Sequence, residues 1–277
     1  MKEIKAFIIV LILSLFVISC NKKNTNNSGS ITKKAPLKVG MELKWPPFET
    51  ITEDGKPTGI SVDLAYELGK YLDRDIEIVD TSFGSLIPAL ETGKIDIIIA
   101  SMSITKERAE KINFSKPYFY FSLVTLLNKN SNIKDKKELF SREGLKFVGP
   151  KSFVALKIPK EKANNPKLLE FDDKSSAVLE VVQGKADAFI IDAIAASEFY
   201  SKYPEQTEIL WDPVEQAKIG MGLRKSDTEL LEKVNTFIND LEKNGVYKRL
   251  AEKYNSIIDK SLPGQTLDFY TTPIGDE

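Results

Sequence analysis

The sequence contains no histidine and only one cysteine. Without histidine it lacks the commonest general base of enzymes, the base of the usual catalytic triads and the commonest zinc ligand. A single cysteine excludes an internal disulfide framework and any metal site built from several cysteines. These absences lower the expectation of an enzyme, and we expect no catalytic residues, no metal and no other cofactor.

The chain also lacks an excess of charge of either sign. Its 39 Lys+Arg residues oppose 40 Asp+Glu residues, which gives a formal net charge of -1. With no dominant basic block, binding of nucleic acid through the phosphate backbone is not expected. The 277 residues, 42% hydrophobic and 29% charged, are typical of soluble proteins and are enough for two domains or one large one.

One long apolar run is present, at the N-terminus. Lys2 and Lys5 precede the run AFIIVLILSLFVIS at residues 6–19. The run is shorter than the roughly 20 apolar residues of a membrane span and fits the core of a signal peptide, so we predict a signal peptide at residues 1–19.

The end of this run, Val17-Ile18-Ser19-Cys20, resembles a bacterial lipobox, in which cleavage leaves a lipidated cysteine as the mature N-terminus. The alternative is an uncleaved anchor with a stray cysteine. We favour lipidation of Cys20, because the chain's one cysteine lies where the motif requires it. The following residues are too polar to pack, so 20–35 is predicted as a tether that holds the protein at the periplasmic face of the cell envelope.

Strand and helix patterns alternate from Pro36 onward. Ser61 is the expected N-cap of the first helix, and Gly93 is expected to end the second. This alternation predicts an α/β architecture with parallel sheets. The expected strands are 37–41, 76–80 and 95–100, and the expected helices are 61–72 and 85–91.

A weak internal echo relates two such units. LIPALETGKIDIIIAS at 86–101 and VLEVVQGKADAFIID at 178–192 each contain a helix, a Gly-Lys-x-Asp turn and a buried strand. Ser101 follows Gly93 by eight residues, and Asp192 follows Gly184 by eight. Because ligands bind at the carboxyl ends of parallel strands, two polar strand ends suggest one site shared by two lobes.

The C-terminal part is predicted to be helical. Apolar residues at helical spacing mark residues 227–254, and Gly245 is expected to divide them into two helices. Residues 262–277 are interpreted as a tail, either a strap or a disordered end, with no assigned role.

Several blocks of the chain resemble the bacterial periplasmic amino-acid-binding proteins of ABC importers, in particular those that bind lysine/arginine/ornithine, histidine and glutamine. The resemblance implies two α/β lobes, each a sheet flanked by helices, joined by two crossover strands that close on a ligand. It places lobe I at residues 36–121 and 219–261 and lobe II at 122–218. The resembling blocks are VGMELKWPPFE, GISVDLAYELG, SFGSLIPALETGKIDIIIASMSITKERAEKINFSKPY, GKADAFIIDAIAAS and IGMGLRKSDTEL.

The resemblance also implies the groups that hold the polar end of a free amino acid. Arg108 matches the arginine that clamps the α-carboxylate, a bidentate and directional pair. Ser101 and Ser103 match the positions that hydrogen-bond the ligand, and Asp192 matches the acceptor of the α-ammonium group. By itself, Asp192 is equally well explained as the cap of a helix that begins near Ala193.

Three further residues match the side-chain end of the ligand. Trp45 matches the aromatic residue that covers the ligand side chain, and Phe83 matches the opposing wall. Glu42 occupies the position of an acid in members that bind basic or amide side chains, although an exposed glutamate without a role explains it equally well. A ligand with a basic or amide side chain is therefore weakly favoured.

The sequence departs from the family pattern in lobe II. Members carry a loop rich in glycine and hydroxyl residues that donates to the carboxylate, whereas this chain has the shorter VGPKSFVAL. Ser152 keeps one donor, Phe153 has no hydroxyl, and Lys151 brings a charge that would favour an acidic side chain, against the hint from Glu42. The identity of the ligand stays open.

The leading hypothesis is therefore a lipoprotein that captures a free amino acid and delivers it to an ABC permease in the inner membrane. One alternative is a cyclohexadienyl-dehydratase-like enzyme on the same scaffold, which would need a general acid. A second is a ligand sensor for a chemoreceptor or kinase, in which the same site would serve a different partner.

Overall fold

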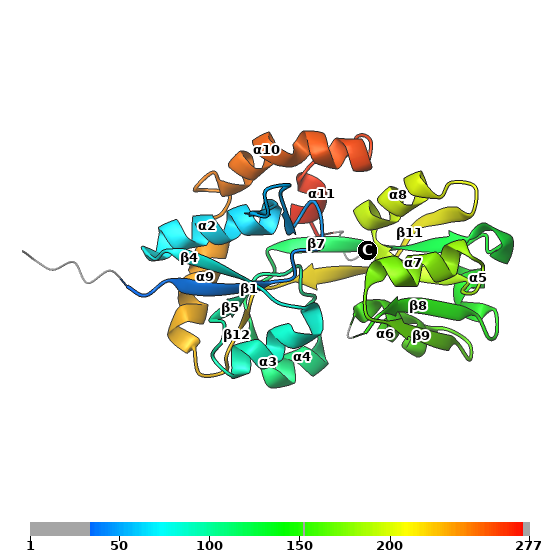
Figure 1. The fold of residues 1–277 in the computed structure, drawn as a ribbon, viewed down its shortest axis with the longest axis horizontal. Coiled ribbons are helices and arrows are strands. Elements are labelled where there is room, and N and C mark those ends of the chain that lie inside the picture. The colour runs from blue at the N-terminus through cyan, green and yellow to red at the C-terminus, as the bar shows by residue number, and fades with distance from the viewer. Residues whose placement is uncertain (1–33, 152, 274–277) are drawn as a thin grey trace, which may run out of the picture. The chain divides into compact units, whose positions relative to one another are not determined.

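The computed structural model describes residues 34–151 and 153–273. The predicted signal peptide, Cys20, most of the tether and Ser152 lie outside the described residues. Within them, two five-stranded sheets are flanked by helices, which is the predicted α/β class (Figure 1). No helix of this part of the chain has the length and apolar character needed to cross a membrane.

The first sheet has the strand order β4-β1-β5-β12-β6. β1 pairs in parallel with β4 and β5, as predicted for the strands near 37–41, 76–80 and 95–100, whereas β12 pairs antiparallel with β5 and β6, so the sheet as a whole is mixed. The antiparallel strand β12 comes from a return of the chain late in the sequence, which local alternation of strands and helices does not reveal. The bounds are β1 Leu37–Met41, β4 Ile76–Asp80, β5 Ile97–Ile98, β6 Asn113–Phe114 and β12 Gly222–Leu223.

The second sheet has the order β11-β7-β10-β8-β9 and is also mixed. β8 pairs in parallel with β9 and β10, and β7 pairs antiparallel with β10 and β11. The bounds are β7 Phe119–Asn128, β8 Lys146–Pro150, β9 Lys167–Phe171, β10 Ala188–Asp192 and β11 Thr207–Ile219; a small hairpin outside both sheets joins β2 Thr50–Ile51 and β3 Pro57–Thr58.

The two longest strands, β7 and β11, connect the two lobes. They pair from Thr207 opposite Asn128 to Ile219 opposite Phe119, and Figure 1 shows both running from one group of elements to the other. The predicted lobe boundaries, at 121/122 and 218/219, fall within these two strands. The fold therefore has two lobes with a two-stranded connection between them.

Helix α2 begins one residue before its predicted start, and Ser61 is not its cap. The cap is Gly59, and the N–H groups of Ile60 and Ser61 donate to the carbonyls of Pro47 and Phe48. These long-range backbone acceptors replace the side-chain cap that the sequence suggested. The helix bounds are α2 Ile60–Leu72, α3 Leu86–Glu91, α4 Lys106–Lys111, α5 Lys136–Ser141, α6 Val154–Lys162, α7 Lys174–Val182, α8 Ala193–Lys202, α9 Thr228–Asn239, α10 Val246–Ser261 and α11 Asp268–Thr271, with short 3-10 turns η1 Phe83–Ser85 and η2 Lys129–Ser131.

Other boundaries follow the predictions with local differences. The apolar segment 95–100 is buried except for the partly exposed Asp96, but only Ile97–Ile98 form ladder pairs. Gly245 adopts a φ of 64° and separates α9 from α10, as predicted, because a left-handed residue ends a run of right-handed helix.

The C-terminal segment packs on the strands between the lobes. Tyr270 of α11 is fully buried, with its ring at 5.2 Å from that of Phe48 and 5.3 Å from that of Phe121 on β7. The described part of the predicted tail, residues 262–273, is thus packed on the fold, since Leu267 and Tyr270 belong to the main apolar core.

Candidate functional site

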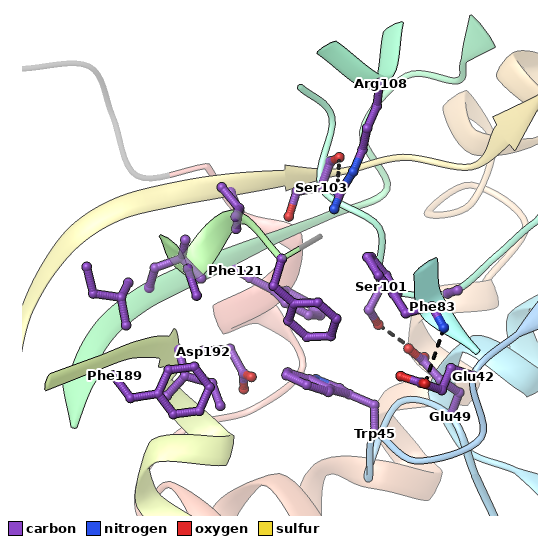
Figure 2. Close-up of a pocket in the computed structure, with 18 residues that line it drawn as sticks. Glu42, Trp45, Glu49, Phe83, Ser101, Ser103, Arg108, Phe121, Phe189 and Asp192 are labelled. Carbon is purple, nitrogen blue, oxygen red and sulfur yellow. Dashed lines mark hydrogen bonds between the residues drawn. The ribbon is translucent and has the colours of Figure 1, made fainter. Parts of the chain in front are cut away.

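A pocket of about 60 Å³ lies between residues of both sheets (Figure 2). Seven of the eight predicted ligand-binding residues line it, and the eighth, Ser152, lies outside the described residues. Most of the polar lining groups follow the carboxyl ends of parallel strands, where open α/β sheets bind ligands. The predicted residues in the lining are Glu42, Trp45, Phe83, Ser101, Ser103, Arg108 and Asp192.

Arg108 lies in the first turn of α4 and is positioned by hydrogen bonds to the residues just before this helix. The hydroxyl of Thr105 caps α4 by accepting the backbone N–H of Arg108 at 3.2 Å, and the guanidinium donates to the carbonyl of Ser103 at 2.8 Å. The guanidinium carbon also lies 5.1 Å from the centre of the Phe83 ring. Burial lowers the pKa of Arg108 to about 10, so it stays charged at neutral pH.

Ser101 and Glu49 form a second polar group. The Ser101 hydroxyl donates to Glu49 Oε2 at 3.0 Å, and the backbone of Ser101 has the left-handed φ of 48°. Burial raises the pKa of Glu49 to about 8, against the hydrogen bond from Ser101 and the positive charge of Lys174. Glu49 is therefore largely a neutral acid at neutral pH in this structure.

Asp192 caps a helix and also lines the pocket. Its Oδ1 accepts the N–H of Ala195 at 3.0 Å and caps α8, while the side chain also lines the pocket. Oδ2 is buried without a hydrogen-bond partner among the described residues. Burial raises the pKa of Asp192, opposed by that cap and by the charge of Lys174.

The aromatic residues of the pocket come from both lobes. The Phe153 ring lies 5.6 Å from that of Trp45 and 4.6 Å from that of Phe83, centre to centre. Glu42 stands beside them and accepts the backbone N–H of Phe83 at 3.2 Å, so one of its carboxylate oxygens is already occupied. The phenylalanine that replaces a hydroxyl residue of the family loop thus contacts both predicted walls of the slot.

Lys151 does not line the pocket, so the structure gives no support to its selecting an acidic side chain. Its side chain is 59% exposed and pairs with Asp172 at 2.8 Å. Phe153, two residues later, is the residue of this stretch that lines the pocket and packs against Trp45.

Sequence reasoning missed Glu49 and Lys174. Glu49 follows the aromatic segment around Trp45, and its burial comes from contacts with residues distant in the sequence, such as Ser101. Lys174 is the first residue of α7 and lies three residues beyond the end of β9, a strand that the sequence pattern did not predict. Lys174 could have been found from its position beyond the end of β9, because β9 belongs to the same sheet as β10, which ends at Asp192, and ligands bind near such strand ends.

The chemistry of the pocket suits a small zwitterion. A guanidinium and serine hydroxyls can bind a carboxylate, the Asp192 carboxylate can accept from an ammonium group, and the aromatic rings can cover an apolar or flat side chain. In the described part of the chain, no cluster of acidic or cysteine side chains is suited to hold a metal ion.

Two lobes on a pair of connecting strands, with a polar and aromatic pocket between them, define a ligand-binding protein of the periplasmic-binding type. The family model of bacterial extracellular solute-binding proteins, family 3, matches residues 37–257, and the chain belongs to that family.

Known relatives agree with this assignment. A probable histidine-binding protein of Campylobacter jejuni is 30% identical over 258 residues, which cover 92% of this chain and 99% of the relative. The structure of an ancestral arginine-binding protein bound to arginine aligns with a TM-score of 0.71 and 32% identity, covering 79% of this chain and 98% of that one. An ancestral amino-acid-binding protein described as a precursor of cyclohexadienyl dehydratase aligns with a TM-score of 0.68 and 33% identity, covering 79% and 94%.

Proposed function

We propose that this protein captures a free amino acid between its two lobes and delivers it to an ABC permease. The observation that carries the proposal is the convergence of Arg108, Ser101, Ser103 and Asp192 on one pocket beside Trp45. Arg108 would clamp the α-carboxylate, and Asp192 would accept from the α-ammonium group. The names of the relatives, which refer to histidine and arginine, support an amino acid as the ligand.

The test is a binding measurement on purified protein that has been unfolded and refolded to remove carried-over ligand. We expect at least one common amino acid to raise the melting temperature and to bind in calorimetry. Arg108→Ala should weaken that binding by at least about tenfold, because a hydrogen bond to a charged group contributes about 1.5–3 kcal/mol. Lys106→Ala is the matched control, since Lys106 is exposed on the same helix. Unchanged affinity of the Arg108 variant would overturn the role of Arg108.

The proposal includes a lipid anchor at Cys20, which would hold the mature protein at the periplasmic face of the membrane by its polar tether. The lipobox-like Val17-Ile18-Ser19-Cys20 supports it. Cys20→Ser should move the protein from the membrane fraction to the soluble fraction of the cell envelope, as followed by immunoblot after fractionation. Release of the native protein by high salt alone would contradict a covalent anchor.

The dehydratase alternative gains one observation from the structure. Glu49, whose pKa is about 8, is a neutral acid in the pocket and so a conceivable proton donor. We nevertheless propose binding without chemistry, since the curated relatives and the ancestral precursor itself are described as binding proteins. Purified protein should leave prephenate and arogenate unchanged by ultraviolet absorbance, and turnover of either would establish the enzyme.

The sensor alternative shares the ligand site and differs only in its partner. Crosslinking of the protein in cells, followed by affinity purification, should recover permease subunits; recovery of a chemoreceptor or kinase in their place would favour the sensor.

A further inference from the structure

Lys174 places a positive charge beside the candidate ligand site. It is the first residue of α7, at the end of the helix where the dipole disfavours a cation, and the neighbouring Asp173 caps the helix by accepting the backbone N–H of Ser176. The Nζ of Lys174 lies 3.7 Å from the centre of the Trp45 ring, close enough for a cation–π contact. Lobe II thus covers the aromatic residue of lobe I with an ammonium group.

The surroundings of this ammonium group are acidic. Burial lowers the pKa of Lys174, while the acidic groups of Asp192, Glu198, Glu49 and Glu42 oppose that shift, Glu49 only when it is ionised. Glu42, Glu49 and Asp192 are also the acidic residues of the pocket lining. The groups that would attract a cationic ligand side chain are therefore the same groups that already act on Lys174.

Phe153 limits the aromatic slot from the same lobe. Its ring contacts both Trp45 and Phe83, the two residues between which a long side chain would be covered. A ligand cation that reached Trp45 would meet Lys174 on the same ring and the repulsion of a like charge. An uncharged side chain would meet no such repulsion.

We propose that Lys174 is a specificity-determining residue of the amino-acid site and selects amino acids with an uncharged side chain over lysine and arginine. The inference rests on the proposed function of the pocket and names the substrate class within it. When no cationic ligand is present, the ammonium group of Lys174 makes the cation–π contact with Trp45 and interacts with the nearby acidic groups. A cationic ligand side chain would have to displace Lys174 from these interactions.

The experiment is calorimetric titration of refolded protein with arginine, lysine and glutamine, which differ in charge but have long side chains. The native protein should bind glutamine more tightly than arginine or lysine. Lys174→Met keeps the apolar stem and removes the charge, and should shift the ratio of arginine to glutamine affinity toward arginine by at least about tenfold. Lys174→Arg keeps the charge and should keep the native ratio.

Lys151→Gln is the matched control, because Lys151 is an exposed lysine of the same lobe that pairs with Asp172, whereas Lys174 lies over Trp45 of the pocket lining. It should leave the ratio unchanged. Circular dichroism melts establish that each variant is folded, and Lys174→Gln replaces Lys174→Met if the latter is not.

Each outcome has one meaning. A native preference for arginine or lysine, or an unchanged ratio in the folded uncharged variants, overturns the role of Lys174 and leaves the amino-acid site standing. Binding of none of the common amino acids by the native protein overturns the proposed function and this inference with it.

Discussion

At the scale of single residues, Glu49 shows how burial changes the chemistry of a side chain. The residue is 2% exposed, and its carboxyl group accepts a hydrogen bond from the Ser101 hydroxyl. The charges of Lys174 and Asp192 act on the pKa of Glu49, and Glu49 in turn acts on the pKa of the Tyr118 phenol. Loss of hydration is the largest effect and raises the pKa of Glu49 from 4.5 to about 8. The proton is thus bound far more tightly in the folded protein than in the unfolded chain.

This difference predicts a pH dependence of stability. Between pH 4.5 and about 8, the folded state keeps a proton on Glu49 that the unfolded chain has lost, so the free energy of unfolding falls as the pH rises. Above pH 8 the contribution is constant. Relative to Glu49→Gln, the native protein should lose on the order of 4 kcal/mol across this range, as measured by urea denaturation without ligand at several pH values.

The control for this measurement is Glu91→Gln, at an exposed position at the end of α3. It should reproduce the native pH profile. If the free energy of unfolding depends on pH in the same way in the native protein and in Glu49→Gln, the pKa of Glu49 is not raised in the folded state.

The Asp192 carboxylate takes part in two structures, a helix N-terminus and the pocket lining. The sequence position of Asp192 suggested two alternative explanations, a helix cap and a ligand acceptor. In the structure one oxygen caps α8 and the side chain also lines the pocket, so the two explanations are compatible. A carboxylate has enough acceptor sites for both.

At the scale of elements, the short helix α11 fastens the C-terminal segment onto β7. Tyr270 packs edge-on against Phe48 and Phe121, and Phe121 is itself part of the pocket lining. The apolar contacts of this one ring thus link the C-terminus to the strands that connect the lobes and to the wall of the site.

Removal of the ring should be costly. Tyr270→Ala leaves a cavity in the core, and we expect the free energy of unfolding to fall by about 3–5 kcal/mol in urea denaturation. Tyr270→Phe is the matched control: the hydroxyl is buried with no hydrogen-bond partner among the described residues, so its removal should not reduce stability. A loss of less than about 1 kcal/mol in the alanine variant would show that α11 is only loosely held.

The strand ends explain why the site is built where it is. β1, β4 and β5 deliver Trp45, Phe83 and Ser101 from one sheet, and β8, β9 and β10 deliver Phe153, Lys174 and Asp192 from the other. Each residue lies at or shortly beyond the carboxyl end of a parallel strand. The echo between Gly93 and Gly184 predicted one pair of these positions, Ser101 and Asp192, and the structure brings both to one pocket.

At the scale of the whole described molecule, the main apolar core is continuous through both lobes. It runs from β1 and α2 through the aromatic residues of β7 and on to β8 and β10. β7 and β11 are therefore packed on their apolar sides as well as paired with each other. Flexing of the lobes about these strands must preserve that packing, which favours movement between a few discrete states.

Local sequence patterns were enough to predict several helices and strands and the α/β class of the fold. Apolar periodicity and glycine positions located α2, β4, α3 and the break at Gly245, because these signals act within a few residues. The resemblance of whole blocks supplied seven candidate site residues, all of which line one pocket, while the eighth, Ser152, came from the stretch that departs from the family pattern.

Features that depend on residues distant in the chain could be seen only once the chain was folded. The tertiary structure placed Lys174 on Trp45, directed Lys151 to the surface, replaced the Ser61 cap by the carbonyls of Pro47 and Phe48, and gave Glu49 its high pKa. Burial and charge are set by neighbours that the fold assembles, and no local pattern records them. The position of a residue in the site could thus be predicted from the sequence, whereas its protonation and its partners came from the packing of the two lobes.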